Sequence, residues 1–245
     1  MIANMIDLTA RQVQILRAII EEFVETAEPV GSDTIDKKFN IGISPATIRN
    51  EMVYLQDQDY LRKSHVSAGR VPTSKAMKLY VNELMKEKEL SVADEVSAKE
   101  KIWKSRDELG GLLYETTRVL ADKTHALSVA ITDERRLYHS GFANLLVMPE
   151  FFDIEVMRQV LQVIEEVSVL DEIFDFGVSE NPIQISFGTE LDNKYLAPIG
   201  AIYTKINAGD RICKLGVIGS ARFDYPYVIP MMKYFKGLIE DLTIG

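Results

Sequence analysis

Apolar residues recur at three- and four-residue steps from Leu8 to Val24, with charged residues between them. This spacing predicts an amphipathic helix of about eighteen residues. Pro29 and Gly31 end it, because proline disfavours a helical conformation in the residue before it and glycine permits a turn. Another helical pattern, from Ser32 to Phe39, predicts a second and shorter helix.

A third helix is predicted to begin at Ser44-Pro45. A hydroxyl can cap the first turn there, and proline at the first helical position loses no hydrogen bond. Ile48, Met52 and Leu55 mark the buried face of this helix. Two short strands, 60–63 and 69–72, then predict a hairpin. Three short helices followed by a hairpin are typical of a winged helix-turn-helix domain, in which the last helix enters the DNA major groove.

After the predicted hairpin, the spacing of apolar residues is first helical and then typical of strands. From Lys75 to Thr124 the spacing is helical, interrupted at Gly110-Gly111, and predicts a connector or a dimerising pair of helices. The predicted strands beyond it are 126–131, 183–187, 198–206 and 212–218, and the predicted helices are 153–175 and 226–242. This order predicts an α+β fold with a mostly antiparallel sheet and helices on one face. We therefore expect a winged-helix domain (1–75), a helical connector (76–124) and a regulatory or dimerisation domain (125–245).

The total charge argues against nucleic-acid binding, whereas its distribution favours it. The chain has 28 basic and 37 acidic side chains, a net charge of -9, and phosphate affinity comes chiefly from lysine and arginine. Between residues 62 and 78, however, there is no acidic residue, and the basic ones are Arg62, Lys63, Arg70, Lys75 and Lys78. A solvated charge run would have the same composition. This run begins on the predicted hairpin, where it can follow DNA phosphates, and we expect Lys75 at its end to be a DNA-binding residue as well.

The predicted third helix carries side chains that can read bases. Thr47, Arg49 and Asn50 lie near its N-terminal end. Arginine can bond to guanine through two donors, asparagine can bond to adenine, and threonine can contact a phosphate or a thymine methyl group. A merely solvated helix, or a winged helix that binds protein, could present the same face. The combination with a basic hairpin favours binding of double-stranded DNA.

The sequence offers no signature of catalysis. His65, His125 and His139 share no metal-ligand spacing, and Cys213 lies inside an apolar strand, which predicts a buried thiol. We expect no catalytic residue, metal or cofactor. The chain opens without a basic segment leading into an apolar run and has no apolar stretch of the ~20 residues that a membrane helix requires. We therefore expect a cytoplasmic protein without a membrane partner.

Two interpretations fit a further group of polar residues near the C-terminal end of the chain. Arg222, Asp224 and Tyr225 follow the last predicted strand and precede the last predicted helix. They could line a small-molecule pocket. Alternatively, Arg222 and Asp224 could form an ion pair that stabilises the corner between strand and helix, and we favour this structural interpretation.

The segments LTARQVQILRAIIEEFVETAEPVGSDTI, SPATIRNEMVYLQDQDYL and HVSAGRVPTSKAMKLYV resemble the N-terminal domain of the HrcA family of bacterial heat-inducible transcription repressors. The resemblance implies a dimer that represses chaperone operons from an inverted-repeat operator, with support from a GroEL-type chaperonin. It places operator contacts on the third helix and on the hairpin, here the wing. The helix residues are Ser44, Thr47, Arg49 and Asn50, and the wing residues are His65, Ser67, Gly69 and Arg70.

The second half is similar to the same family, whose C-terminal domain is GAF-like. The similarity lies in YHSGFANLL leading to PEF, and in LGVIGSARFDYP. This chain passes from Ile131-Thr132-Asp133 to Arg136-Leu137-Tyr138, where typical members carry part of that domain and an inserted dimerising region. We therefore expect the connector helices, or the C-terminal sheet and helix, to hold a homodimer. Two other hypotheses stay open: a winged-helix regulator that senses a small molecule, and a protein-interaction module that does not bind DNA.

Overall fold

The computed structural model describes residues 7–63, 69–175 and 181–243, and it divides into two compact units, Met1–Lys86 and Glu87–Gly245. The sequence-based boundaries lay at 75 and 124. In the structure, the first helix after the hairpin belongs to the first unit, whereas the two longer helices of the expected connector pack within the second. The chain between residues 76 and 124 is thus shared by the two units.

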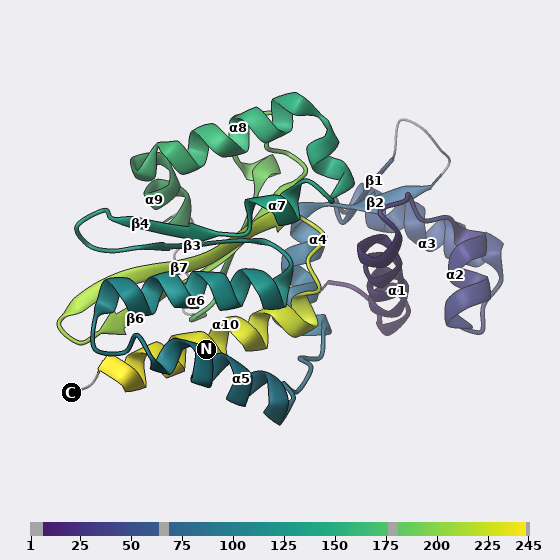
Figure 1. The fold of residues 1–245 in the computed structure, drawn as a ribbon. Helices are drawn as coiled ribbons and strands as arrows, with labels where there is room; N and C mark the ends of the chain where they lie inside the picture. Colours follow the sequence, from purple (N-terminus) through teal and green to yellow (C-terminus); the bar gives the residue numbers. More distant parts are fainter. Residues whose placement is uncertain (1–6, 64–68, 176–180, 244–245) are drawn as a thin grey trace. The chain divides into compact units, whose positions relative to one another are not determined.

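The first unit contains three helices, a two-stranded sheet and a closing helix (Figure 1). Its elements are α1 (Ala10–Thr26), α2 (Ser32–Phe39), α3 (Pro45–Asp57), β1 (Leu61–Lys63), β2 (Arg70–Pro72), α4 (Ser74–Leu79) and the π-helical turn η1 (Tyr80–Leu84). Side-chain caps set the helix starts: Thr9 and Gln12 form a reciprocal capping box, and the Ser44 hydroxyl accepts from the Thr47 amide. The three predicted helices and the hairpin are confirmed.

The core of the first unit comes from the inward faces of the three helices. The fully buried side chains include Ile15, Leu16, Ile19, Ile35, Ile48 and Leu55. The hairpin is joined to the turn between α1 and α2, because the backbone groups of Val30 and Arg70 exchange two hydrogen bonds of 2.8 and 2.9 Å. The wing is therefore anchored to the helices through its second strand.

The second unit is built on a five-stranded, fully antiparallel sheet in the order β4-β3-β7-β6-β5. Its strands are β3 (Leu127–Ile131), β4 (Leu137–Ser140), β5 (Gln184–Phe187), β6 (Ile199–Ala208) and β7 (Arg211–Ser220). Its helices are α5 (Val92–Trp103), α6 (Leu109–Thr124), α7 (Phe142–Leu145), α8 (Ile154–Glu165), α9 (Val167–Asp175) and α10 (Tyr225–Thr243), with short 3-10 turns η2 (Pro149–Phe152) and η3 (Gly188–Glu190). The antiparallel sheet was predicted, whereas the edge strand β4 was not.

Helices cover both faces of this sheet, so the expectation of helices on one face is wrong (Figure 1). Leu127, Val129 and Ile131 alternate along β3 and pack in one core with α8 and α9. The Phe174 ring of α9 stacks on Tyr203 of β6 with centroids 4.7 Å apart. The opposite face of the sheet is covered by α6 and α10. A strand covered on both faces is buried at every position, as β3 is, and four of its five residues are apolar.

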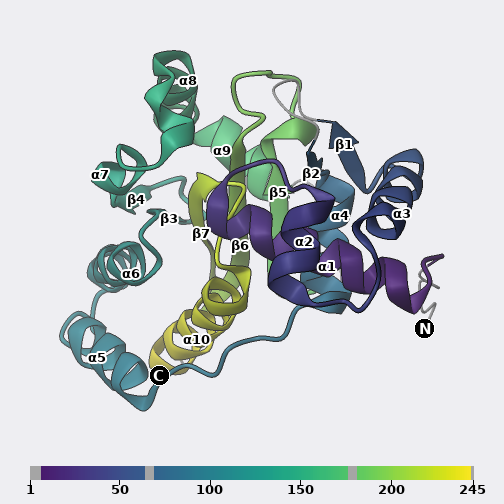
Figure 2. The same ribbon diagram turned by 90° about the vertical axis from the view of Figure 1, so that its right-hand side faces the viewer.

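Helices α5, α6 and α10 lie together in the second unit (Figure 2). The Tyr234 hydroxyl of α10 donates to the Glu95 carbonyl of α5 over 2.7 Å. The predicted break at Gly110-Gly111 is displaced: α5 ends at Trp103, and both glycines lie in the first turn of α6. The predicted helix 153–175 is two helices, which separate at Glu166.

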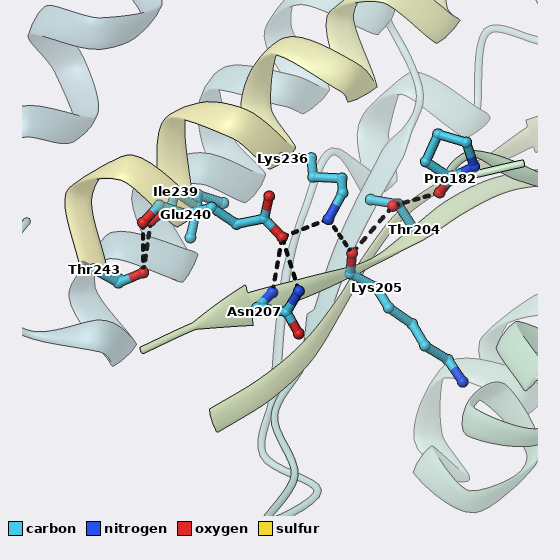
Figure 3. A network of polar contacts seen from close by, with 8 residues as sticks. All are labelled: Pro182, Thr204, Lys205, Asn207, Lys236, Ile239, Glu240 and Thr243. Atoms are coloured by element: carbon cyan, nitrogen blue, oxygen red, sulfur yellow. Dashed lines mark hydrogen bonds and ion pairs between the residues drawn. The ribbon is translucent and has the colours of Figure 1, made fainter. Parts of the chain in front are cut away.

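Polar contacts fix the C-terminal helix to the edge of β6 (Figure 3). The Lys236 ammonium donates to the Lys205 carbonyl over 2.9 Å and pairs with Glu240. Glu240 also accepts from the Asn207 amide over 3.0 Å. Burial opposes ionisation of Glu240, but the Asn207 amide and Lys236 lower the pKa of its carboxyl below the ordinary value. The second unit therefore uses its charges for internal cohesion.

Candidate nucleic-acid interface

Helix α3 presents a polar face to solvent along one side. Ile48, Met52 and Leu55 are buried in the unit, whereas Ser44, Arg49 and Asn50 are exposed. Ser44 caps the helix, and its hydroxyl lies 3.0 Å from that of Thr47. The predicted base-reading residues thus occupy the outward face of the first two turns, where no core packing restrains their side chains.

A groove of about 560 Å³ brings this face together with the wing and the start of α2. It is lined by Gly31, Ser32, Asp33, Arg49, Met52, Lys63, Gly69 and Arg70. The strand register explains why two basic side chains meet there: Lys63 is paired directly with Arg70 across the hairpin, so both side chains point to the same face. Three cations, one from α3 and one from each strand of the hairpin, therefore surround one groove.

The electrostatics of the groove favour an anionic ligand. Its lining has three cationic side chains and one carboxylate, that of Asp33. Within the described ranges, the side chains of Arg49, Asn50 and Lys63 make no hydrogen bond or ion pair with the rest of the chain. The first residues of α2 line the same groove, and their cap Gly31 supplies no side-chain acceptor for the first backbone N–H groups of the helix. These groups together can hold phosphate oxygens.

Lys75 lies apart from these residues. Its ammonium donates to the Gln58 carbonyl over 2.8 Å and stands 4.2 Å above the centre of the Tyr60 ring. Both partners follow the C-terminal end of α3, and a helix of 13 residues extends roughly 20 Å from its start. The structure therefore does not bring Lys75 together with Ser44, and gives its ammonium a role in closing α3.

Gly69 has a steric role at the base of the wing. A Cβ atom at this position would lie 2.7 Å from the carbonyl oxygen of Pro29, which is closer than real Cβ contacts. Only glycine lets the wing approach the turn between α1 and α2 this closely. The predicted wing residues His65 and Ser67 lie outside the described residues.

Sequence reasoning did not include Lys63 or the first turn of α2 among the candidate site residues. Lys63 belonged to the basic run, and the pairing of its strand with β2 is the signal that would have placed it beside Arg70. The start of α2 carries no basic residue, and its charged side chain is the carboxylate of Asp33. Its proximity to α3 and the wing follows only from the folded unit.

The second group of predicted residues, after β7, is held by internal partners. The Arg222 guanidinium lies 2.6 Å from Glu150, which also accepts from the Ser220 hydroxyl over 2.7 Å. Asp224 pairs with Lys88 at 2.6 Å. The Tyr225 hydroxyl donates to a backbone carbonyl, and burial raises the pKa of this phenol. The arrangement is that of a structural corner, but its ion pairs join Arg222 to Glu150 and Asp224 to Lys88, where the sequence suggested a pair between Arg222 and Asp224.

The described part of the chain offers little support for a reactive thiol, a metal site or a membrane-spanning helix. Burial raises the pKa of the Cys213 thiol to about 11, which keeps it protonated at neutral pH. Among the residues with assigned positions, no three His, Cys, Asp or Glu side chains gather as a metal site would require. No described helix combines the length and apolarity needed to cross a membrane.

Comparisons with known proteins agree with the geometry of the groove. The family model for the winged helix-turn-helix, DNA-binding domain of the HrcA transcription repressor matches residues 7–86. The model for the HrcA C-terminal domain matches residues 48–229. Together they extend over both units.

Two curated relatives show how this similarity is distributed. The heat-inducible transcription repressor HrcA of Symbiobacterium thermophilum is 27% identical over 334 aligned positions, which include 95% of this chain and 98% of that protein. The alignment is longer than the 245-residue chain, so the relative carries residues that this chain lacks. HrcA of Clostridioides difficile is 42% identical over 126 positions, covering 51% of this chain and 37% of that protein.

A solved structure shares the fold. It is the crystal structure of a hypothetical protein at 2.2 Å resolution, with a TM-score of 0.81 and 19% identity over 96% of this chain and 98% of that one. The likeness supports the observed architecture, and the two family models cover the winged unit and most of the second unit. The chain therefore belongs to the HrcA family of heat-inducible transcription repressors.

Proposed function

We propose that this protein represses heat-shock chaperone operons by binding an inverted-repeat DNA operator as a dimer. One observation carries the proposal: Arg49 on α3 shares a groove with Lys63 and Arg70 on the wing. The family membership supports transcriptional repression as the outcome of that binding. The dimer and the inverted repeat rest on the resemblance and on the two-fold symmetry that such an operator requires.

In this proposal α3 enters the major groove with its N-terminal turns first. The exposed side chain of Arg49 bonds to the O6 and N7 atoms of a guanine, and Asn50 bonds to an adenine. Thr47 and Ser44 contact a phosphate or a thymine methyl group at the helix start. Because Arg49 and Asn50 have no side-chain partner within the described residues, no internal bond must break when they bind bases.

The wing and α2 supply contacts that do not depend on base sequence. Lys63 and Arg70 neutralise backbone phosphates, and the amide N–H groups at the start of α2 donate to a further phosphate oxygen. His65 and Ser67 belong to the same proposal through the family resemblance. Lys75 contributes by stabilising the end of α3, since its ammonium is held by Gln58 and Tyr60.

The test is a salt titration of fluorescence anisotropy with the purified full chain. One duplex carries an inverted repeat of the kind that the family recognises, and the other is a scrambled duplex of equal composition. We expect a preference of about a hundredfold or more for the inverted repeat, with affinity falling steeply as salt rises. Equal and weak binding to both duplexes would contradict the proposal.

Chaperonin support is a separate part of the proposal and rests on the family resemblance alone. Its test adds purified GroEL-type chaperonin to the same binding reaction after the repressor has been partly inactivated by mild heat. Recovery of operator binding with chaperonin and ATP, and no recovery with an inert protein of equal mass concentration, is the expected result. Identical recovery with both additions would contradict chaperonin support.

A further inference from the structure

Helices α8 and α9 leave part of the space between them and the sheet of the second unit unfilled. A cavity of about 40 Å³ remains there, lined by side chains of both helices, of strands β5, β6 and β7, and of the segment that follows β5. The described lining is apolar except for the hydroxyl of Ser186. All of these residues belong to the second unit, so the cavity is a feature of that unit alone.

Small side chains on two neighbouring strands account for the cavity. Ser186 of β5 is paired directly with Ala201 of β6, so both side chains point to the same face of the sheet. The larger residues Ile199 and Tyr203 lie on either side of Ala201 on that face, because side chains two positions apart share a face. Ser186 and Ala201 therefore form a depression, and both line the cavity.

An aliphatic group suits this cavity better than water. A water molecule needs about 10–15 Å³ of such space, so the volume is enough for roughly three. Each water also needs about two to four polar partners, whereas the backbones of the central strands β6 and β7 are already paired in the sheet. The Ser186 hydroxyl, 3.2 Å from that of Tyr203, is the single polar side chain of the described lining. A chain of about three carbon atoms fills the same space and leaves no hydrogen bond unmade.

A larger groove adjoins the cavity. It has a volume of about 520 Å³ and is lined by residues of α8, of α9 and of the segment after η3. Four apolar residues line both spaces: Val163, Ile173, Leu191 and Leu196. The first three are partly exposed, so they form the boundary between the cavity and solvent. A ligand can therefore place one end in the cavity and the other in the groove.

The groove carries acids without partners. Glu166, Glu172 and Asp192 line it and are exposed, and their carboxylates make no hydrogen bond or ion pair within the described part of the chain. No lysine or arginine is among its described lining residues. Two cations next to the lining in sequence are already engaged: Arg158 pairs with a carboxylate of its own helix, and Lys194 lies over a tyrosine ring. The groove therefore complements a positive charge.

Amide side chains fix the shape of the groove. Gln159 of α8 donates to Gln162 over 2.9 Å and accepts from Asn193 over 2.6 Å. These bonds join α8 to the segment after η3, which form two walls of the groove. A ligand thus meets walls that are already in place, which lowers the cost of ordering them on binding.

We infer that the cavity and groove together bind a small aliphatic amine. Its hydrocarbon chain enters the cavity, and its ammonium group lies among Glu166, Glu172 and Asp192. Alcohols and carboxylates of the same chain length fill the cavity equally well but lack the charge that the groove selects. The inference is independent of DNA binding, because every described lining residue belongs to the second unit.

The first experiment titrates the full chain with primary alkylamines from propylamine to octylamine and follows its methyl resonances by NMR. We expect the dissociation constant to fall about fourfold with each added methylene, because each one leaves water, and to level off once the cavity is filled. The largest shifts should occur at Val160, Val163 and Leu170, which line the cavity. Absence of binding, affinity independent of chain length, or shifts spread over the whole surface would overturn the inference.

The head group tests the charge of the ligand at constant chain length. Hexylamine should bind about tenfold more tightly than hexanol, and hexanoate should bind most weakly, because three carboxylates surround the groove. Equal dissociation constants for the three compounds would contradict the assignment of a cationic ligand.

A plug at the boundary between cavity and groove tests the location. Val163→Trp should weaken hexylamine binding at least tenfold, since the larger side chain narrows the boundary. Val96→Trp makes the same change at an exposed position of α5 and should alter the constant less than twofold. Thermal unfolding verifies that both variants fold. Binding of wild-type strength in Val163→Trp would contradict the site.

A charge variant keeps the test valid if the plugged protein does not fold, because it changes only exposed side chains. Glu166→Gln/Glu172→Gln should weaken hexylamine binding about fivefold and leave hexanol binding unchanged. The control Glu100→Gln/Glu165→Gln removes the same charge at exposed positions outside the described lining and should leave both constants unchanged. Equal losses in the two variants would show that the net charge of the protein, and not the groove, attracts the amine, and would overturn the inference.

Discussion

The two units differ in net charge, and the cations of the candidate groove differ in pairing from those around the sheet. The first unit carries 11 basic and 11 acidic side chains, and the second carries 17 and 26, so the whole formal charge of -9 belongs to the second. In the first unit, Arg49 and Lys63 have no side-chain partner among the described residues. In the second, Lys214 lies 2.6 Å from Asp171 and 2.8 Å from Asp175.

This difference identifies which cations can bind a ligand. Arg211 of the second unit contacts Asp133 and Glu134, and Arg222 contacts Glu150. A paired cation must give up its carboxylate before it binds a phosphate, whereas an exposed cation without a partner releases only water and counterions. The count of basic residues is therefore a weaker guide to DNA binding than the number of basic side chains left without carboxylates.

The largest effect is expected from removing the side chains of α3 that we propose to read bases. In the double variant Arg49→Ala/Asn50→Ala we expect specific operator binding to fall about a thousandfold, because each base contact contributes roughly 1–3 kcal/mol. Arg211→Ala is the control, since that guanidinium is paired within the second unit. Anisotropy on specific and scrambled duplexes measures both. An equal loss in the control would refute the distinction between paired and unpaired cations.

The same chemical change at two glycines compares the backbones of the units. Gly69→Ala should destabilise the first unit by about 1–3 kcal/mol, because the new Cβ would lie 2.7 Å from the Pro29 carbonyl oxygen. Gly237→Ala meets no atom within 4 Å inside α10 and should stabilise the second unit by about 0.5–1 kcal/mol. Urea unfolding, followed separately for each unit by hydrogen exchange, measures the two effects. Unchanged stability of the Gly69→Ala wing would contradict the steric argument.

A third comparison separates basic residues within the first unit. Lys63→Ala should lower affinity for every duplex severalfold and reduce the slope of log affinity against log salt by about one. Lys75→Ala should leave that slope unchanged, because its ammonium is held by the Gln58 carbonyl. Salt titrations of both variants on the scrambled duplex provide the measurement. A reduced slope for Lys75→Ala would show that this side chain also contacts phosphate.

The two units also differ in how far their sequence predicts them. The predicted bounds of α2, Ser32 to Phe39, agree with the structure because local signals fix both ends. In the second unit, α8 and α9 cover a face of the sheet that periodicity alone did not assign. The nearly continuous apolar run of β3, interrupted only by Ser128, did contain that information, since every residue of the strand is buried. Edge strand β4 was missed because it has four residues and none is fully buried.

The candidate site was predictable where it depends on one helix and unpredictable where it depends on contacts between elements. Arg49 and Asn50 follow from the cap at Ser44 and the apolar period of α3. Lys63 required the pairing of β1 with β2, and the ion pair between Arg222 and Glu150 joins residues 72 positions apart. Sequence spacing carries no information about such a partner.

The smallest expected effect concerns acid, and it tests the internal pairing of the second unit. Hydrogen bonds from Lys214 and Lys205 lower the pKa of Asp175, and those from Lys123 and Ser91 lower that of Asp94, both below the ordinary value of 3.8. A carboxyl whose pKa is lower in the folded state stabilises that state above its unfolded pKa, and this stabilisation is lost as pH falls through the folded pKa.

The melting temperature of the second unit should therefore decrease from about pH 5 downward. In Lys214→Met, which removes a partner of Asp175, the decrease should be smaller by about 2 °C, because a partly exposed pair contributes little. Arg49→Met is the matched control, as it removes a cation without an internal partner, and it should leave the pH dependence unchanged. Differential scanning calorimetry from pH 6 to pH 3.5 would measure all three proteins, and parallel curves for wild type and Lys214→Met would show that pairing in the second unit does not stabilise it.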